Sequence, residues 1–136
     1  MEKIDALSLW RLNYRVTVAT IASVTDEVSA LGLDWKEINI LDAIPGHPHP
    51  AALAERLMIP KPTMTAYLKR LEAAGLVRRE IDPDDLRRHR LSVTAAGKQL
   101  AQKGLSLLSE AFGKRLARLS APQRATLAEL LETMSD

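Results

Sequence analysis

The sequence predicts a mainly α-helical fold with a small β-hairpin, arranged as a winged helix-turn-helix domain with N- and C-terminal dimerisation helices. Large apolar residues recur every three or four positions along most of the chain, which is the period of an α-helix. This pattern stops at Gly75, and a short alternating segment, a polar turn and a second alternating segment follow. We expect one domain over residues 1–136, with its winged helix-turn-helix core at about 34–97 and dimerisation helices at about 4–31 and 98–134.

The first predicted helix runs from Ile4 to Leu31, a stretch without proline or glycine, and Gly32 is expected to end it. Its main stripe, at three- and four-residue steps, is Leu7, Trp10, Tyr14, Val18, Ile21, Val24, Val28 and Leu31. Leu9, Leu12, Val16 and Ala19 widen that stripe. A helix that is apolar on more than one face is usually covered by more than one neighbour, and we expect a second copy of the chain to be one of them.

The second predicted helix spans about Trp35 to Ile44, with Asp34 as its N-cap and with Ile38, Leu41 and Ile44 inward. The following PGHPHP segment, Pro45 to Pro50, has too many prolines for a regular element. His47 and His49 lie in it without a cysteine or a carboxylate close in sequence. We therefore expect a turn with solvated histidines and no metal site.

A short helix over Pro50 to Ile59 is predicted next, with Leu53, Leu57 and Met58 inward. After a brief link, another helix begins at Lys61 with Pro62 in its first turn, where a missing backbone N–H costs nothing. Its buried stripe is Met64, Leu68 and Leu71. These two helices form the predicted helix-turn-helix.

The other face of the helix after Pro60 has no carboxylate. It carries Thr63, Thr65, Ala66, Lys69 and Arg70, and Glu72 is the first acid. A helix that buries one side and offers hydroxyl groups and cations on the other suits the major groove of DNA, where its opening turn meets base edges.

The predicted hairpin begins at Leu76, turns at Asp82-Pro83-Asp84-Asp85, and returns through basic residues 87–90 to Leu91-Ser92-Val93. A hairpin with a charged tip directly after such a helix is typical of a wing. Thr94 is then expected to cap a long helix from Ala95 to about Arg118, in which Gly97, Gly104 and Gly113 favour a bend or a close helix approach. Ser120 and Pro122 mark the start of the last helix, with Leu127, Leu130, Leu131 and Met134 inward.

The net charge of the chain is small, but its basic residues are concentrated in one region. The formal net charge is 19 − 17 = +2, yet one basic cluster occupies the middle third: Lys69, Arg70, Arg78, Arg79, Arg87, Arg88 and Arg90. This distribution indicates a groove-binding surface. The absence of cysteine excludes disulfides and thiol-based metal or redox sites.

Other function classes are disfavoured by what the sequence lacks. It holds no Gly-rich phosphate loop and no marked nucleophile beside an acid/base pair, so we expect no enzyme. It has no apolar run of the ~18 residues that a bilayer requires, and its N-terminus does not read as a signal peptide. We therefore expect a cytoplasmic protein.

Three motifs resemble the MarR family of bacterial transcriptional regulators: LxxxGLVxR at Leu71 to Arg79, the Asp-x-Arg of Asp85 and Arg87, and LxVTxxGK at Leu91 to Lys98. Trp35 to Ile44 is similar to the family's helix before the helix-turn-helix, and Leu119 to Met134 to its closing dimerisation helix. Leu86 and Ala66 differ from residues more usual in the family. The resemblance implies an intertwined homodimer that binds DNA, often as a ligand-responsive repressor.

A two-fold dimer would place two copies of the Lys61 to Arg70 segment in successive major grooves, ~34 Å apart, on a pseudo-palindromic operator. The expected DNA-binding residues are Lys61, Pro62, Thr63, Thr65, Ala66, Lys69, Arg70, Arg87, Arg88 and Arg90. Thr63 and Thr65 would meet bases or phosphates, whereas Lys61, Lys69 and Arg70 would mostly meet phosphates.

The wing is expected to reach the flanking minor groove, with Arg87 as the inserted side chain. Asp85 is expected to orient an arginine, either Arg87 or Arg79, rather than to touch DNA; equally, it is only a turn former.

Regulation by a small aromatic or anionic effector is implied by the resemblance, and no other cofactor is expected. The aromatic residues that could line its crevice are Trp10, Tyr14 and Trp35, although aromatic residues at helical spacing are also ordinary core. The alternative function is a winged-helix dimer that acts as a protein-interaction scaffold without specific DNA binding.

Overall fold

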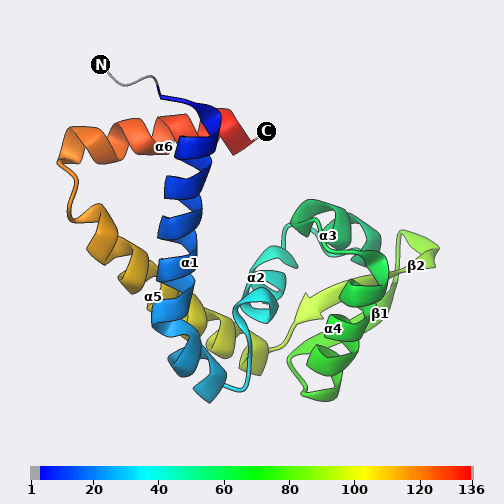
Figure 1. Cartoon of the computed structure of the whole chain (residues 1–136). Coiled ribbons are helices and arrows are strands. Elements are labelled where there is room, and N and C mark those ends of the chain that lie inside the picture. The colour runs from blue at the N-terminus through cyan, green and yellow to red at the C-terminus, as the bar shows by residue number, and fades with distance from the viewer. Residues whose placement is uncertain (1–3, 136) are drawn as a thin grey trace. The chain divides into compact units, whose positions relative to one another are not determined.

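A computed structural model describes residues 4–135. In chain order it contains α1 (Ala6–Ala30), α2 (Trp35–Ala43), α3 (Pro50–Leu57), α4 (Lys61–Ala73), β1 (Val77–Asp82), β2 (Asp85–Val93), α5 (Ala95–Leu116) and α6 (Ala121–Ser135) (Figure 1). The predicted fold class is confirmed: a mainly helical chain with one two-stranded antiparallel hairpin among the described residues.

The chain divides into two compact units. One is Thr25–Ser106, and the other holds the described residues through Val24 together with those from Leu107 onward. The first of these contains α2, α3, α4 and the hairpin, and therefore the whole predicted winged helix-turn-helix core. Most of the buried apolar side chains lie in it: Val28, Leu33, Ile38, Ile40, Leu41, Ile44, Leu53, Met64, Leu68, Leu71, Leu76, Val77 and Leu91.

Local signals set the start of α2. Gly32 has φ +82°, the left-handed conformation that ends α1. Asp34 caps α2 as predicted, because its Oδ1 accepts the Glu37 N–H at 2.8 Å. The Glu37 side chain accepts the Asp34 N–H in return, at 3.2 Å, which completes a capping box.

The helix-turn-helix consists of α3 and α4, with Leu53, Met64, Leu68 and Leu71 buried as predicted. The prediction that Met58 points inward is wrong. Helix α3 ends at Leu57, and Met58 adopts the left-handed conformation with φ 54° and is 90% exposed. Periodicity had placed Met58 on the buried stripe, but the chain leaves the helix at that residue.

Replacing Met58 by glycine is expected to stabilise the protein by roughly 1 kcal/mol. The left-handed conformation costs a residue with a β-carbon about this much free energy, and glycine avoids that cost. The melting temperature should rise by a few degrees, as measured by circular dichroism. Met58→Ala is the matched control: it removes the same exposed side chain but keeps the strained conformation. An equal gain in both variants would contradict the role assigned to the backbone.

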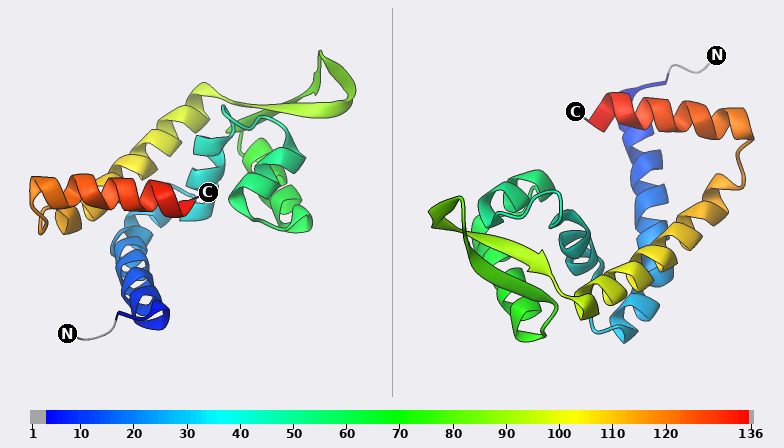
Figure 2. Two further views of the ribbon diagram at one scale, coloured as in Figure 1. Left: turned by 90° about the horizontal axis from the view of Figure 1, so that it is seen from above. Right: turned by 180° about the vertical axis from the view of Figure 1, so that it is seen from behind.

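The hairpin is antiparallel, with Val77 opposite Val93 and Ile81 opposite His89, and its register shifts between Ile81 and Asp82. Gly75, with φ +74°, separates it from α4. The hairpin extends past α3 and α4 in each view, so that its tip stands clear of the helices (Figure 2). This is the geometry expected of a wing, and the β1–β2 hairpin is called the wing below.

Helix α5 approaches its neighbours closely at two glycines. A β-carbon on Gly97 would lie 2.2 Å from the Leu76 carbonyl oxygen, and one on Gly104 would lie 2.2 Å from Ile38 Cδ1. The expected close helix approach is therefore confirmed at Gly104, which meets Ile38 of α2, whereas Gly97 approaches the segment between α4 and β1. At Gly113 a β-carbon would meet nothing within 4 Å of it in the described chain. Thr94 caps the helix as predicted, accepting the Gly97 N–H at 3.1 Å.

The terminal helices bury little within one chain. Helix α6 begins as predicted, with Ser120 and Gln123 exchanging hydrogen bonds, but it has no buried residue. The prediction that Leu130, Leu131 and Met134 point inward is therefore wrong for a single chain, whereas Leu127 is half-buried. The first part of α1 is likewise exposed at Leu7, Leu9, Trp10, Leu12, Tyr14, Val16 and Val18. Among the described residues no single helix could span a membrane; α1 and α2 pass that test only together, as a bent pair.

Candidate nucleic-acid interface

The outer face of α4 is open to solvent. Its exposed residues are Lys61, Pro62, Thr63, Thr65, Ala66, Lys69 and Arg70, on the side away from the buried Met64, Leu68 and Leu71. The first turn carries no acid, and the N-terminus of a helix bears a partial positive charge. Thr65 Oγ1 donates to the Lys61 carbonyl at 2.9 Å. This face can meet an anionic, hydrogen-bonding partner.

One cationic side chain of α4, Arg70, forms ion pairs within the protein. Arg70 Nε donates to Glu37 Oε2 at 3.2 Å, and its Nη2 lies 3.9 Å from Asp34 Oδ2. The guanidinium carbon also lies 5.3 Å from the centre of the Tyr67 ring. Arg70 thus docks α4 onto the capped start of α2. Its side chain is still 61% exposed, so the expected phosphate contact of Arg70 stays a prediction.

Tyr67 shares this environment. Partial burial, with the Asp34 carboxylate nearby, raises the pKa of the Tyr67 phenol above its ordinary value of 10.0. The phenol therefore stays neutral at physiological pH and can donate a hydrogen bond from the middle of α4.

The tip of the wing presents Arg87. Its Nε and its backbone N–H both lie 3.1 Å from Asp85 Oδ1, while its side chain is 91% exposed. Hydrogen bonds from Arg87 hold the pKa of the Asp85 carboxyl below its usual value. Of the two arginines considered as partners for Asp85, the structure pairs it with Arg87.

Arg79, the other arginine considered for Asp85, has a different partner. Its Nε donates to Glu72 Oε1 at 2.9 Å, and its Nη1 lies 3.3 Å from His89 Nδ1. It therefore links the wing to the C-terminal part of α4. Arg90 is exposed on the same strand as Arg87.

Asp82 is the centre of a third cluster, at the end of β1. The residue is 1% exposed. Its Oδ1 accepts the Asp84 N–H at 2.8 Å, and its Oδ2 lies 2.6 Å from His49 Nε2 and 3.0 Å from Arg88 Nε. The prediction of solvated histidines is wrong for His49, whose carboxylate partner comes from the distant wing. Arg88, expected to bind DNA, is held in part by the same carboxylate.

The Asp84 N–H, His49 and Arg88 together lower the pKa of Asp82 to about 2, although burial opposes them. Because this folded-state pKa lies below that of an unfolded aspartate, the ionised carboxylate stabilises the folded state at neutral pH. That contribution is lost as the pH falls from about 4 towards about 2.

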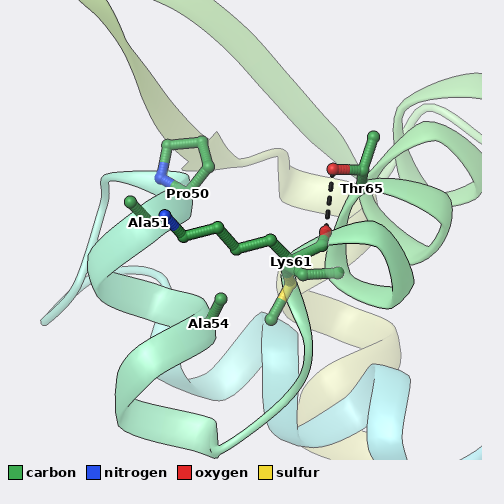
Figure 3. A pocket seen from close by; sticks show the side chains of 6 residues that line it. Pro50, Ala51, Ala54, Lys61 and Thr65 are labelled. Atoms are coloured by element: carbon green, nitrogen blue, oxygen red, sulfur yellow. Dashed lines mark hydrogen bonds between the residues drawn. The ribbon is translucent and has the colours of Figure 1, made fainter.

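A pocket of about 200 Å³ lies between the first turns of α3 and α4 (Figure 3). It is lined by Pro50, Ala51, Ala54, Lys61, Met64 and Thr65. The Lys61 side chain runs across it, with its ammonium near Pro50 and Ala51 (Figure 3). The lining is apolar apart from one ammonium and one hydroxyl, which suits a small molecule with an apolar body and a negative charge. Sequence reasoning missed this pocket because its walls come from two helices.

The predicted effector crevice rests on aromatic residues of both units. Trp10 and Tyr14 are exposed on α1, with ring centroids 6.0 Å apart. Trp35 is partly exposed at the first turn of α2. Their grouping into one crevice stays a prediction. Within the described residues no three His, Cys, Asp or Glu side chains lie close enough together to hold a metal ion.

Comparison with known proteins gives a consistent answer. Residues 31–88 match the model of the MarR family. An HTH-type transcriptional repressor of Mycobacterium tuberculosis is 32% identical over 133 residues, which cover 96% of this chain and 95% of that protein.

Solved structures similar to this chain also include MarR proteins. A MarR family protein of Mycobacterium tuberculosis in complex with p-aminosalicylic acid is 30% identical, with a TM-score of 0.74, and covers 94% of this chain and 98% of its own. A mutant MarR from Escherichia coli complexed with operator DNA shares the fold at 24% identity and a TM-score of 0.77, over 93% of this chain and 92% of its own.

Proposed function

This chain belongs to the MarR family, and from that premise we propose that it is a transcriptional regulator that binds a pseudo-palindromic DNA operator as a homodimer. The observation that carries the proposal is the acid-free, exposed face of α4 beside an arginine-tipped wing. The name of the mycobacterial relative favours repression. Such a regulator would act in the cytoplasm, where its DNA is, and would bind without catalysing a reaction.

We assign direct contacts to the first turns of α4. Thr63 and Thr65 would face base edges or phosphates, with their methyl groups available to thymine. Lys61 and Lys69 would meet phosphates, which fix the register but carry no sequence information. Arg70 is given a positioning role instead, because Glu37 and Asp34 hold its guanidinium.

The dimer would use the terminal helices, whose apolar side chains are exposed in the single chain. In this arrangement residues 1–136 form one functional domain, with the core at about 34–97 and dimerisation helices at about 4–31 and 98–134. The two copies of α4 would enter successive major grooves ~34 Å apart.

Selection of bound fragments from a random pool of double-stranded DNA tests the proposal. An inverted repeat with half-sites about one helical turn apart is the expected result. The alternative, a winged-helix scaffold for other proteins, predicts only weak and sequence-blind binding at about 150 mM salt.

Arg87→Ala is expected to weaken operator binding and to flatten its salt dependence. Each phosphate contact releases close to one counterion, so the loss of one contact per protomer should reduce the slope of log K against log salt by about 2. Fluorescence anisotropy between about 50 and 300 mM salt would measure it. Arg118→Ala removes the same charge from the exposed α5–α6 connection and should leave the slope unchanged. Equal slopes for wild type and Arg87→Ala would remove Arg87 from the interface.

We also propose a small aromatic or anionic effector. Two places on the chain suit it: the pocket between α3 and α4, and the aromatic residues Trp10, Tyr14 and Trp35. An effector acts only if it binds the DNA-incompetent state more tightly. Titration with an aryl carboxylate such as benzoate should therefore release the operator, and a Lys61→Gln or a Trp10→Ala variant would show which place is used. Unchanged operator affinity at millimolar ligand would count against an effector of this class.

A further inference from the structure

His49 occupies the N-cap position of α3 but does not cap it. The residue is extended, with φ −103° and ψ 131°, and its side chain makes no hydrogen bond to the first turn. This position strongly favours Ser, Thr, Asp or Asn, whose short side chains reach the free N–H groups. Here the helix start relies on Pro50 at its first position instead. The His49 side chain is therefore available for another contact.

That contact is with the wing. His49 Nε2 lies 2.6 Å from Asp82 Oδ2, although 33 residues separate the two in sequence. The carboxylate is buried; its Oδ1 accepts the Asp84 N–H, and the Oδ2 that contacts His49 also accepts a hydrogen bond from Arg88 Nε. A second link lies next to it, because the Leu91 N–H donates to the Pro48 carbonyl at 2.7 Å. The segment before α3 thus holds both strands of the wing.

We propose that His49 is a wing-positioning residue, which fixes the orientation of the wing relative to the helix-turn-helix through Asp82. This inference rests on the proposed DNA-binding function, since it concerns two elements of one interface. Correct spacing between Arg87 and the first turn of α4 would let the wing and the helix engage neighbouring grooves together. A short cap residue at position 49 could not reach Asp82, which accounts for an imidazole at a position that favours a hydroxyl.

Two variants separate positioning from simple stability. His49→Thr supplies a good N-cap for α3 but is too short to reach Asp82. His49→Gln carries an amide N–H group at nearly the same distance from the backbone as Nε2, and should restore the contact. If His49 served only local stability, the threonine variant would equal or exceed the wild type in every measurement.

The first measurement uses the free protein and does not depend on DNA. Amide hydrogen exchange of the wing between Glu80 and Arg90 should be on the order of tenfold faster in His49→Thr than in wild type. Amides of α4 should be unaffected, and His49→Gln should exchange near the wild-type rate. Unchanged wing exchange in His49→Thr would overturn the proposal, whether or not the chain binds an operator.

The second measurement is operator binding as a function of salt. The salt slope of His49→Thr should fall towards that of Arg87→Ala, with affinity on the order of tenfold weaker at about 150 mM salt and an unchanged preference within the half-site. His49→Gln should recover most of both. A mobile wing with an unaltered salt slope would overturn the positioning role. Failure of the wild type to select any operator would instead refute the proposed function, while the exchange data would still decide whether His49 holds the wing.

Discussion

The Gly97→Ala variant is expected to lose much of its stability, although it adds only one methyl group. The new β-carbon would lie 2.2 Å from the Leu76 carbonyl oxygen and 2.8 Å from Val93 Cγ1. That carbonyl also accepts the Thr94 N–H at 3.0 Å, so it cannot move without opening the junction between the wing and α5. Overpacking of this kind costs up to about 3 kcal/mol or more, and the gain in helix propensity returns only about 1 kcal/mol.

Thermal unfolding followed by circular dichroism should show a midpoint lower by on the order of 10 °C for Gly97→Ala. Gly104→Ala is the informative comparison, because it lies in the same helix and its β-carbon would also meet an atom at 2.2 Å. There the obstacles are Cδ1 of Ile38 and, at 2.8 Å, its Cγ1, both atoms of a side chain that can change rotamer and not of the backbone. The loss should be smaller and should diminish further when Ile38→Val removes that methyl group. Equal losses in the two glycine variants would contradict the backbone argument.

These glycines show which part of the fold the sequence could predict. Helix ends at Gly32, Asp34, Gly75 and Ser120 depend on residues within one turn, so local reasoning located them. The surfaces that Gly97 meets come from elsewhere in the chain, and only a general expectation of close approach was available. The prediction that Met58 is buried was wrong for a related reason, because a period of about 3.6 residues does not show where the helix ends.

The candidate site likewise has features that the sequence could predict and features that depend on tertiary packing. Periodicity separated the buried stripe of α4 from its exposed face correctly, because both belong to one helix. It could not show which cations of that surface are already paired. Arg70 meets Glu37, and His49 meets Asp82, and each pair joins residues 33 positions apart. Such pairs depend on how the elements pack, so the sequence did not reveal the Glu37 partner of Arg70 and placed His49 in a solvated turn.

For the terminal helices, the sequence predicted which faces are apolar but could not show what covers them. The sequence predicted apolar faces on α1 and α6, and in the structure the apolar residues of α6 are at most half-buried within their own chain. Leu130 and Leu131 are 55% and 43% exposed. Burying one leucine contributes roughly 1.5–3 kcal/mol, so a two-fold interface that covers both in each of two protomers would gain several kcal/mol from these side chains alone.

The double variant Leu130→Glu/Leu131→Glu is therefore expected to be monomeric. Sedimentation at micromolar concentration should give twice 15.0 kDa for the wild type and 15.0 kDa for the variant, because burying four carboxylates at such an interface is prohibitive. Circular dichroism should change little, since α6 has no fully buried residue within its own chain. Operator affinity should fall by about 100-fold or more, because two half-sites can no longer be bound by one linked pair. Met58→Glu, at an exposed apolar residue outside the terminal helices, should remain dimeric; a monomeric wild type, or a double variant that still sediments as a dimer, would refute the arrangement.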